Sequence, residues 1–303
     1  MKKLLFSLTT ASVLLMTACT KSTNKQQNIV DFVTGNPNFT LLTQALTKAE
    51  LVSTVQNGRG ITVFAPDNDA FARAGISAAT ITALDKVALA NILAYHVVPA
   101  EVVSGQIASG SSMAATLAGT NRLNLSNFGS GIFVNGNTRV KDPNYAFTNG
   151  TVHVVDNVIM PPAGNIVAIA SANPNLSLLV QAVVRCNLAG VLNGAGPFTV
   201  YAPTNDAFIR AGFTSAAITN ATPATISTLT NVLLFHVLPQ RAFTTDLPGT
   251  TMPVTSFGGR TLNVVNGIAL RGPGNLNARS AVTIPNIAAT NGVVHVIDQV
   301  LLP

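Results

Sequence analysis

Charge is scarce in this chain. Charged residues make up 9% of its 303 residues, whereas an average soluble domain holds roughly 25%. Four of the lysines lie in the first 25 residues, residues 28–162 carry a net charge of −1, and residues 163–303 carry +3. A protein that binds nucleic acid normally presents a strong basic stripe. The composition therefore argues against nucleic acid as a partner, and Asn, Thr, Ser and Gly fill the polar positions instead.

Cysteine is almost absent as well, with only Cys19 and Cys186 in the chain. Cys186 ends an apolar helical pattern that begins at Leu178. Since Cys19 has a separate role described below, Cys186 has no partner for an internal disulfide. We predict a buried, inert thiol; a reactive thiol would need an activating base that the sequence does not show.

Two common catalytic motifs are also missing. Ser-His-Asp hydrolysis needs an activated serine, and no Gly-x-Ser-x-Gly occurs. The glycine-rich stretch Arg271–Gly274 is not followed by the Lys-Ser/Thr pair of a phosphate-binding loop. We therefore predict a protein that is not an enzyme and that holds no cofactor.

The chain begins with a charged residue pair and then an apolar stretch, Leu4 to Ala18, too short to span a bilayer comfortably. The stretch ends Leu15-Met16-Thr17-Ala18-Cys19, which resembles the lipobox of bacterial lipoproteins, although Met16 stands where Leu, Val or Ile is usual. This predicts a signal peptide over 1–18, lipidation of Cys19, a tether over 19–27, and anchoring to the bacterial envelope, at the outer membrane or facing the periplasm. A plain secretory signal and a secreted protein are the alternative.

One stretch occurs twice. Residues 61–75 and 198–212 are identical at eleven of fifteen positions, and each copy predicts a short strand, a proline stop and a capped helix. Asp67 and Thr204 are the expected helix caps. The residues to which we assign a structural role in this corner are Pro66, Asn68, Asp69 and Phe71, and their counterparts Pro203, Asn205, Asp206 and Phe208.

Further repeats keep the same order along the chain and define two domains, residues 28–162 and 163–303, joined at Pro161–Gly164. In each, apolar helical spacing closes at a proline after Leu89–His96 or Leu229–His236. Short β-favouring runs follow, with Asn266-Gly267 as a hairpin signal. Helices first and strands later predict an α+β fold, not a parallel βαβ sheet.

Three motifs recur in both copies: Thr-Val-Phe/Tyr-Ala-Pro, a central Tyr/Phe-His, and a closing Thr-Asn-Gly-x-Val-His-Val-x-Asp. Together they resemble the fasciclin domain. The resemblance implies two tandem domains, each a wedge or barrel of β-strands flanked by helices, in a non-catalytic adhesion protein. It also makes the motif residues Tyr95, His96, Phe235 and His236 candidates for partner contact. Phe235 replaces the family's tyrosine, which puts any role of that hydroxyl in the second domain in doubt.

All four histidines fall in repeated motifs. His96 and His153 with Asp156, and His236 and His295 with Asp298, could each form a metal site of two imidazoles and one carboxylate. Alternatively, His96 and His236 bond free carbonyls at helix ends, while His153 and His295 are neutral, hydrogen-bonded rings in buried strands. We predict the structural role, with Asp156 and Asp298 also structural, and no metal.

Surface recognition remains as the function. We predict adhesion or extracellular matrix interaction, with surface or matrix proteins as partners and the membrane reached only through the lipid anchor. A polysaccharide-binding accessory protein of the envelope is the alternative. Arg260, Arg271 and Arg279 fall in the strand half of the second domain and could meet an anionic glycan, or could be scattered, solvated side chains.

Overall fold

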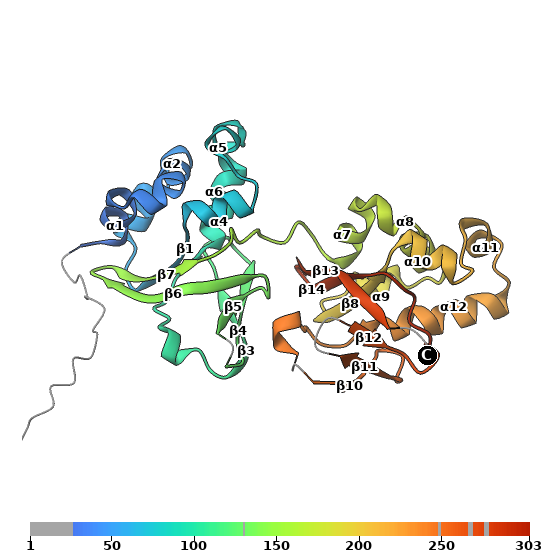
Figure 1. Ribbon diagram of the computed structural model, residues 1–303. Helices are drawn as coiled ribbons and strands as arrows, with labels where there is room; N and C mark the ends of the chain where they lie inside the picture. The colour runs from blue at the N-terminus through green and yellow to red at the C-terminus, as the bar shows by residue number, and fades with distance from the viewer. Residues whose placement is uncertain (1–26, 130, 248–249, 266–268, 276–278) are drawn as a thin grey trace, which may run out of the picture.

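The computed structural model describes residues 27–303 except 130, 248–249, 266–268 and 276–278. The signal peptide, Cys19 and the tether up to residue 26 lie outside the described residues, as does the Asn266-Gly267 turn. The chain forms two successive domains of similar construction, blue to green and yellow to red in Figure 1.

The first domain begins with helices, and side-chain oxygens cap the free N–H groups at the start of several of them. Asn28 and Asp31 form a capping box at the first helix, and Asp67 caps the helix of the repeated corner. The helices are α1 (Ile29–Gly35), α2 (Thr40–Lys48), α3 (Val52–Asn57), α4 (Asn68–Arg73), α5 (Ala78–Ala83) and α6 (Lys86–Tyr95), with 3-10 turns η1 (Pro37–Phe39) and η2 (Ser104–Gln106).

The first domain's strands form one sheet in the order β2-β1-β7-β6-β5-β4-β3. They are β1 (Ile61–Pro66), β2 (Val97–Val98), β3 (Gly110–Ala115), β4 (Arg122–Asn127), β5 (Ile132–Val134), β6 (Thr138–Phe147) and β7 (Gly150–Val155).

The second domain repeats this plan, with the sheet order β10-β11-β12-β13-β14-β8-β9. Its helices are α7 (Ile166–Ala172), α8 (Ser177–Arg185), α9 (Ala189–Leu192), α10 (Asn205–Arg210), α11 (Ser215–Thr219) and α12 (Pro223–Phe235), with 3-10 turns η3 (Pro174–Leu176) and η4 (Thr244–Asp246). Its strands are β8 (Phe198–Pro203), β9 (Val237–Leu238), β10 (Met252–Thr255), β11 (Thr261–Val265), β12 (Ala269–Arg271), β13 (Ser280–Ala289) and β14 (Gly292–Ile297).

The α+β class is confirmed, but two details differ from the expectation. The corner strand pairs in parallel with the closing strand in each domain, β1 with β7 and β8 with β14, so each sheet is mixed. The helices α6 and α12 end at Tyr95 and Phe235, one residue before the expected ends at His96 and His236, and the residues that follow pair with the corner strand as β2 and β9.

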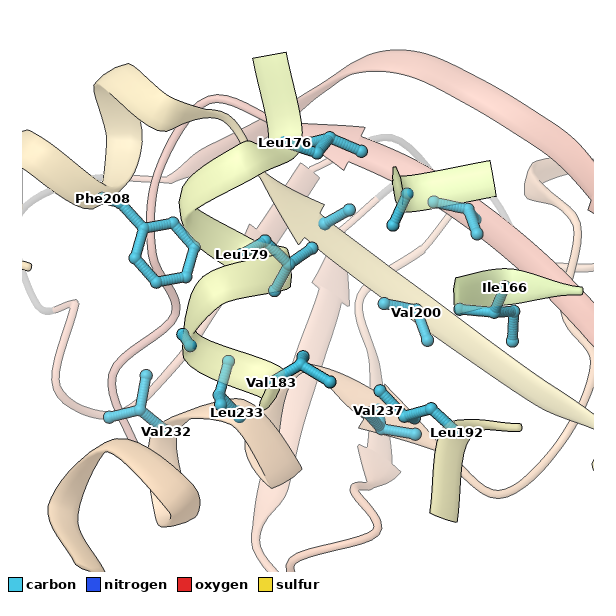
Figure 2. Packing of buried hydrophobic residues seen from close by; sticks show 14 of the residues in the cluster. Ile166, Leu176, Leu179, Val183, Leu192, Val200, Phe208, Val232, Leu233 and Val237 are labelled. Carbon is cyan, nitrogen blue, oxygen red and sulfur yellow. The ribbon is translucent and has the colours of Figure 1, made fainter. Parts of the chain in front are cut away.

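Each domain has two apolar clusters. One lies between the helices and the sheet; in the second domain α8 supplies Leu179 and Val183, which pack against Val200 of β8 and Leu233 of α12 (Figure 2). The other is enclosed by the curled strands, around Leu262, Val264 and Leu270 in the second domain. Buried apolar side chains on both faces explain why β1, β7, β8 and β14 are buried throughout.

No single helix in the described part of the chain is long and apolar enough to cross a membrane. One bent pair of helices, Ile166–Ala172 with Pro174–Arg185, has the length and composition of a membrane span, but its residues Ile166, Leu176, Leu179 and Val183 belong to the core in Figure 2.

Candidate functional site

The Tyr-His motif residues are all buried. Tyr95 and Phe235 are 0% exposed, and His96 and His236 are 2% exposed. In this conformation none of the four side chains can touch a partner, which corrects the hypothesis of direct contact. Tyr95 and Phe235 are the last residues of α6 and α12, and His96 and His236 follow directly. All four therefore belong to the buried C-terminal end of the helix.

His96 and His236 cap their helices, as predicted. The Nδ1 of His96 bonds the carbonyl oxygen of Ile92 at 2.8 Å, and its Nε2 accepts a hydrogen bond from the N–H of Ile159 at 2.9 Å. His236 repeats this with Val232 and Leu301. Burial lowers the pKa of both rings from 6.5 to about 4, because removal from water disfavours the charged imidazolium.

His153 and His295 are also neutral rings held by the backbone. The Nε2 of His153 bonds Val102 O at 2.7 Å and its Nδ1 accepts from Asn144 N at 3.1 Å; His295 makes the same pair of bonds with Ala242 and Asn286. Burial lowers both pKa values, that of His295 to about 4. Both ring nitrogens are therefore occupied by backbone groups, which leaves no lone pair for a metal, and no cluster of metal-binding side chains occurs among the described residues.

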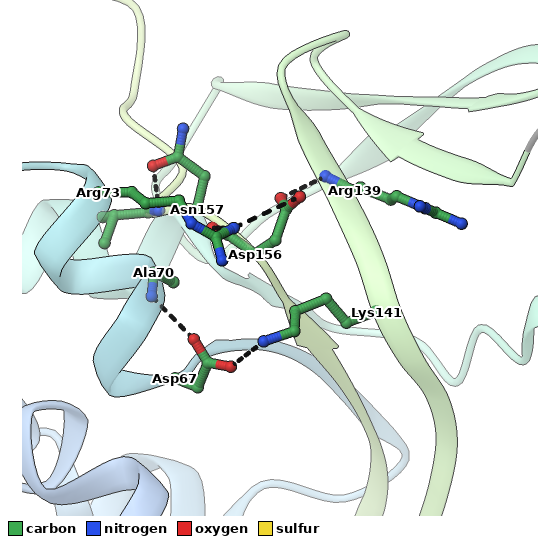
Figure 3. A network of polar contacts seen from close by, with 8 residues as sticks. Asp67, Ala70, Arg73, Arg139, Lys141, Asp156 and Asn157 are labelled. Atoms are coloured by element: carbon green, nitrogen blue, oxygen red, sulfur yellow. Dashed lines mark hydrogen bonds and ion pairs between the residues drawn. The ribbon is translucent and has the colours of Figure 1, made fainter.

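The corner motif is an internal joint (Figure 3). Asp67 accepts from the N–H of Ala70 at 2.8 Å and pairs with Lys141 at 2.5 Å, while Asp156 accepts from Arg139 N at 2.7 Å. Asp298 makes the corresponding bond to Ala281 N at 2.7 Å. The Asp67–Lys141 pair joins the corner helix α4 to β6, whereas Asp156 and Asp298 join the ends of β7 and β14 to β6 and β13, so all three aspartates have structural roles.

The other motif residues connect the corner helix to a neighbouring helix or complete the corner itself. Asn68 and Asn205 hold the start of α2 and α8 by accepting from Leu41 N and Leu178 N. The remaining motif residues are placed as expected: Pro66 and Pro203 end their strands, Asp69 and Asp206 lie in the first helical turn, and Phe71 and Phe208 are buried.

Two further sets of predicted residues are placed by the structure. Cys186 is buried, as expected for an inert thiol. Arg260, Arg271 and Arg279 are exposed on the strand half of the second domain. Their joint action on an anionic glycan stays a prediction.

The two domains meet through a turn of the first domain and a bulge of the second. The side-chain Nδ2 of Asn286 donates to Gly136 O and to Asn137 Oδ1, each at 3.0 Å, and Asn137 Nδ2 donates to Asn286 O at 3.2 Å. Asn286 lies where β13 shifts register and has φ +61°, a bulge that points its amide outward.

Glycine is required at the centre of that turn. Gly136 has φ +69°, and a Cβ there would lie 2.8 Å from Asn286 Cγ and from Phe243 Cβ. Tyr95 braces the turn from inside, because its hydroxyl accepts from Asn135 Nδ2 at 3.0 Å and donates to Arg122 O at 2.9 Å. The tyrosine hydroxyl of the Tyr-His motif therefore supports the domain interface in the first domain.

A second polar contact crosses the interface. Ser126 Oγ, fully buried on β4, donates to Asp246 Oδ1 of η4. Burial raises the pKa of Asp246, and bonds from Ser126, Phe243 N and Asn124 oppose the rise. Beside the joint, a cleft of about 560 Å³ is lined by both domains, with Asn137 and Ile159 on one side and Ile169 and Asn286 on the other.

The first domain carries a separate polar groove of about 350 Å³. Phe32 and Tyr145 stack at its edge with ring centroids 5.4 Å apart. The groove is lined by Phe32, Asn36, Asn38, Phe39, Asp67, Asn68, Asp69, Lys141, Asp142, Tyr145 and Val154. The corresponding positions of the second domain include Ile169, Thr204, Thr283, Ile284 and Ile287, so the groove's aromatic and charged character belongs to the first domain.

Sequence reasoning missed both the turn at Asn135–Asn137 and the groove. An available signal for the turn was the Asn135-Gly136 pair, which favours positive φ. The groove joins residues from the helix half and the strand half, so no local pattern marks it.

The fasciclin domain family model matches residues 37–161 and 174–303. Protein sll1483 of Synechocystis is 37% identical over 152 residues, covering 50% of this chain and 79% of that protein. Transforming growth factor-beta-induced protein ig-h3 of Sus scrofa is 27% identical over 246 residues, covering 80% of this chain but only 34% of ig-h3. This chain therefore spans about a third of that relative.

Among solved structures, a domain pair from the insect cell adhesion molecule Fasciclin I matches 89% of this chain and 98% of its own, with 18% identity and a TM-score of 0.40.

Proposed function

This chain belongs to the fasciclin domain family, and from that premise we propose that it is a non-catalytic adhesion protein, anchored to the bacterial envelope by lipid on Cys19. Fasciclin domains are found in cell adhesion and extracellular matrix proteins such as ig-h3 and periostin. The partners we propose are matrix or surface proteins.

The observation that carries the proposal is the groove of the first domain. Aromatic residues are enriched at protein interfaces, because each buries a large apolar area. Phe32 and Tyr145 provide such a stacked pair beside Asp69, Lys141 and Asp142. The second domain has aliphatic side chains at the aromatic positions, so we assign partner contact to the first domain and support of the pair to the second.

The same groove favours a second candidate function, polysaccharide binding. Amide and carboxylate groups such as those of Asn36, Asn38 and Asp69 can hydrogen-bond sugar hydroxyls beside an aromatic ring. The exposed Arg260, Arg271 and Arg279 of the second domain would add attraction for anionic glycans, which salt screens.

Binding of the intact two-domain protein to immobilised matrix proteins and to envelope polysaccharides separates these functions. The double variant Phe32→Ile/Tyr145→Ile, which installs the second-domain residues, should lose at least tenfold in affinity for the true ligand class. The comparison variant, Arg260→Ser/Arg271→Ser/Arg279→Ser, should weaken binding of anionic glycans at low salt and reduce its salt dependence, and should leave binding of matrix proteins unchanged. Undiminished binding by the groove variant would refute the assignment, and no binding by wild type to either class would refute adhesion.

The lipid anchor is tested independently at the N-terminus. Mass spectrometry of the native protein should show an acylated Cys19 as the first residue, and Cys19→Ala should release the protein from membranes. A soluble, unmodified chain that begins elsewhere would favour the secreted alternative.

A further inference from the structure

The second domain contains a site that receives a turn from its neighbour. Asn286 makes three hydrogen bonds to the Asn135-Gly136-Asn137 turn: its Nδ2 donates to Gly136 O and Asn137 Oδ1, and its backbone carbonyl accepts from Asn137 Nδ2. Contact with the turn leaves Asn286 only 4% exposed.

The second domain builds this site from its own backbone. Asn286 is fixed by a bond from its N–H to His295 Nδ1 at 3.1 Å, and its Oδ1 accepts from Thr244 N at 2.9 Å. One hydrogen of its Nδ2 goes to Thr244 Oγ1 at 2.8 Å. The second hydrogen therefore points toward the turn, since an amide nitrogen has two hydrogens to donate.

The first domain contains the same construction. Asn144, with φ +67° against +61° for Asn286, also lies in a register shift of its strand. Its N–H donates to His153 Nδ1 at 3.1 Å, its Oδ1 accepts from Ser104 N at 2.8 Å, and its Nδ2 donates to Ser104 Oγ at 2.5 Å. Each bond has its counterpart in the second domain.

The two sites differ in occupancy. Asn144 is exposed where Asn286 is buried, so the side chain of Asn144 is accessible to a partner. The neighbouring positions also change: Arg241 becomes Glu101, Phe243 becomes Val103, and Asp246 becomes Gln106. The first-domain site is therefore more acidic and more open.

We infer that Asn144 and Ser104 form a second turn-receiving site, whose occupant is the turn of a fasciclin-type domain from another molecule. The occupant's chemistry follows from the second domain: a backbone carbonyl from a glycine and a following asparagine side chain. Glu101 in place of Arg241 favours an occupant with a basic residue beside the turn. This chain's own Asn-Gly-Asn turn is held by its second domain, where the short joint keeps the effective concentration high. The inference does not depend on the ligand class proposed for the groove.

The first test uses the intact, ¹⁵N-labelled protein and a disulfide-closed hairpin peptide with the sequence of residues 132–139. The amide signals of Ser104 and Asn144 should shift saturably as peptide is added, and Asn144→Ala should abolish the shifts around Ser104. Shifts confined to the region of Asn286, or shifts at Ser104 that survive in Asn144→Ala, would overturn the inference. Saturable shifts at Ser104 and Asn144 with an oligosaccharide but not with the peptide would also overturn it.

The second test does not require the peptide to fold. Asn286→Ala should free the turn of each molecule, so the variant should self-associate with rising concentration in analytical ultracentrifugation, while wild type stays monomeric. The double variant Asn144→Ala/Asn286→Ala should return to monomer. Equal association of the single and double variants, or a monomeric Asn286→Ala whose domains are shown by small-angle scattering to have separated, would overturn the inference.

Discussion

The two domains place one buried tyrosine hydroxyl differently. The first domain has Phe64 on its corner strand and Tyr95 at the end of α6, whereas the second has Tyr201 and Phe235 at these positions. The hydroxyl of Tyr95 bonds Asn135 and Arg122 and so braces the interface turn. The hydroxyl of Tyr201 is buried and has no hydrogen-bond partner among the described residues.

This difference shows that nearly the same core can serve two purposes. Both rings fill the apolar interior and bury similar surfaces, so packing alone does not distinguish the two arrangements. The hydroxyl matters only where a polar turn lies within reach, and that turn is the part of the first domain that holds the second. Four substitutions or conditions test the comparison, in order of decreasing effect.

Acid should destabilise the second domain before the first. Burial lowers the pKa of all four histidines, to about 4 for His236 and His295 in the second domain and for His96 in the first. A histidine with a lowered folded pKa stabilises the fold at neutral pH and loses this contribution as the pH falls from 6.5 toward 4, by about 3 kcal/mol per ring. Domain-resolved NMR signals followed from pH 7 to pH 4 measure the order. Simultaneous loss of both domains would contradict the expected difference.

Substitution of His153 and of His295 should distinguish the stability of each domain from the docking of the two domains. His153→Ala and His295→Ala each leave two backbone groups without partners and should cost about 1–3 kcal/mol in the affected domain. Only His295→Ala should also loosen the interface, because His295 positions Asn286. Calorimetry measures the first effect and small-angle scattering the second. Equal scattering changes in both variants would show that the histidine does not position the docking residue.

Gly136→Ala should separate the domains at a smaller cost in stability. The new Cβ clashes with Asn286 and Phe243, and the left-handed backbone adds roughly 1–2 kcal/mol of strain. Gly119→Ala is a matched control in the same domain, because Gly119 has φ +68° but nothing within 4 Å of the new Cβ. NMR relaxation should show independent tumbling for Gly136→Ala only. Independent tumbling of both variants would attribute the effect to backbone strain.

The tyrosine exchange should have the smallest effect. Tyr95→Phe removes two hydrogen bonds and should lower the free energy of unfolding of the first domain by about 1 kcal/mol, with weaker docking. Tyr201→Phe should be neutral or slightly stabilising, because it removes a buried hydroxyl that has no partner. Denaturant unfolding measures both. A loss from Tyr201→Phe as large as that from Tyr95→Phe would mean that the two hydroxyls are equivalent.

Much of each domain could be predicted from the sequence. Local patterns were enough for the corner strand and its helix, because Asp67 and Thr204 cap the next turn and Phe71 and Phe208 follow at helical spacing. Duplication showed the two domains. The histidines could be assigned neutral, structural roles because they lie at helix ends and inside apolar strands.

The tertiary structure alone decided the rest. The parallel pairing of β1 with β7 joins residues nearly ninety positions apart, and no local period reports which strands become neighbours. Burial of Tyr95 and His96 depends on how α6 meets the sheet. The docking of Gly136 on Asn286 joins residues 150 positions apart. It requires a bulge, a positive φ and a fixed orientation of the two domains together, and hydrophobic patterns along the chain specify none of these.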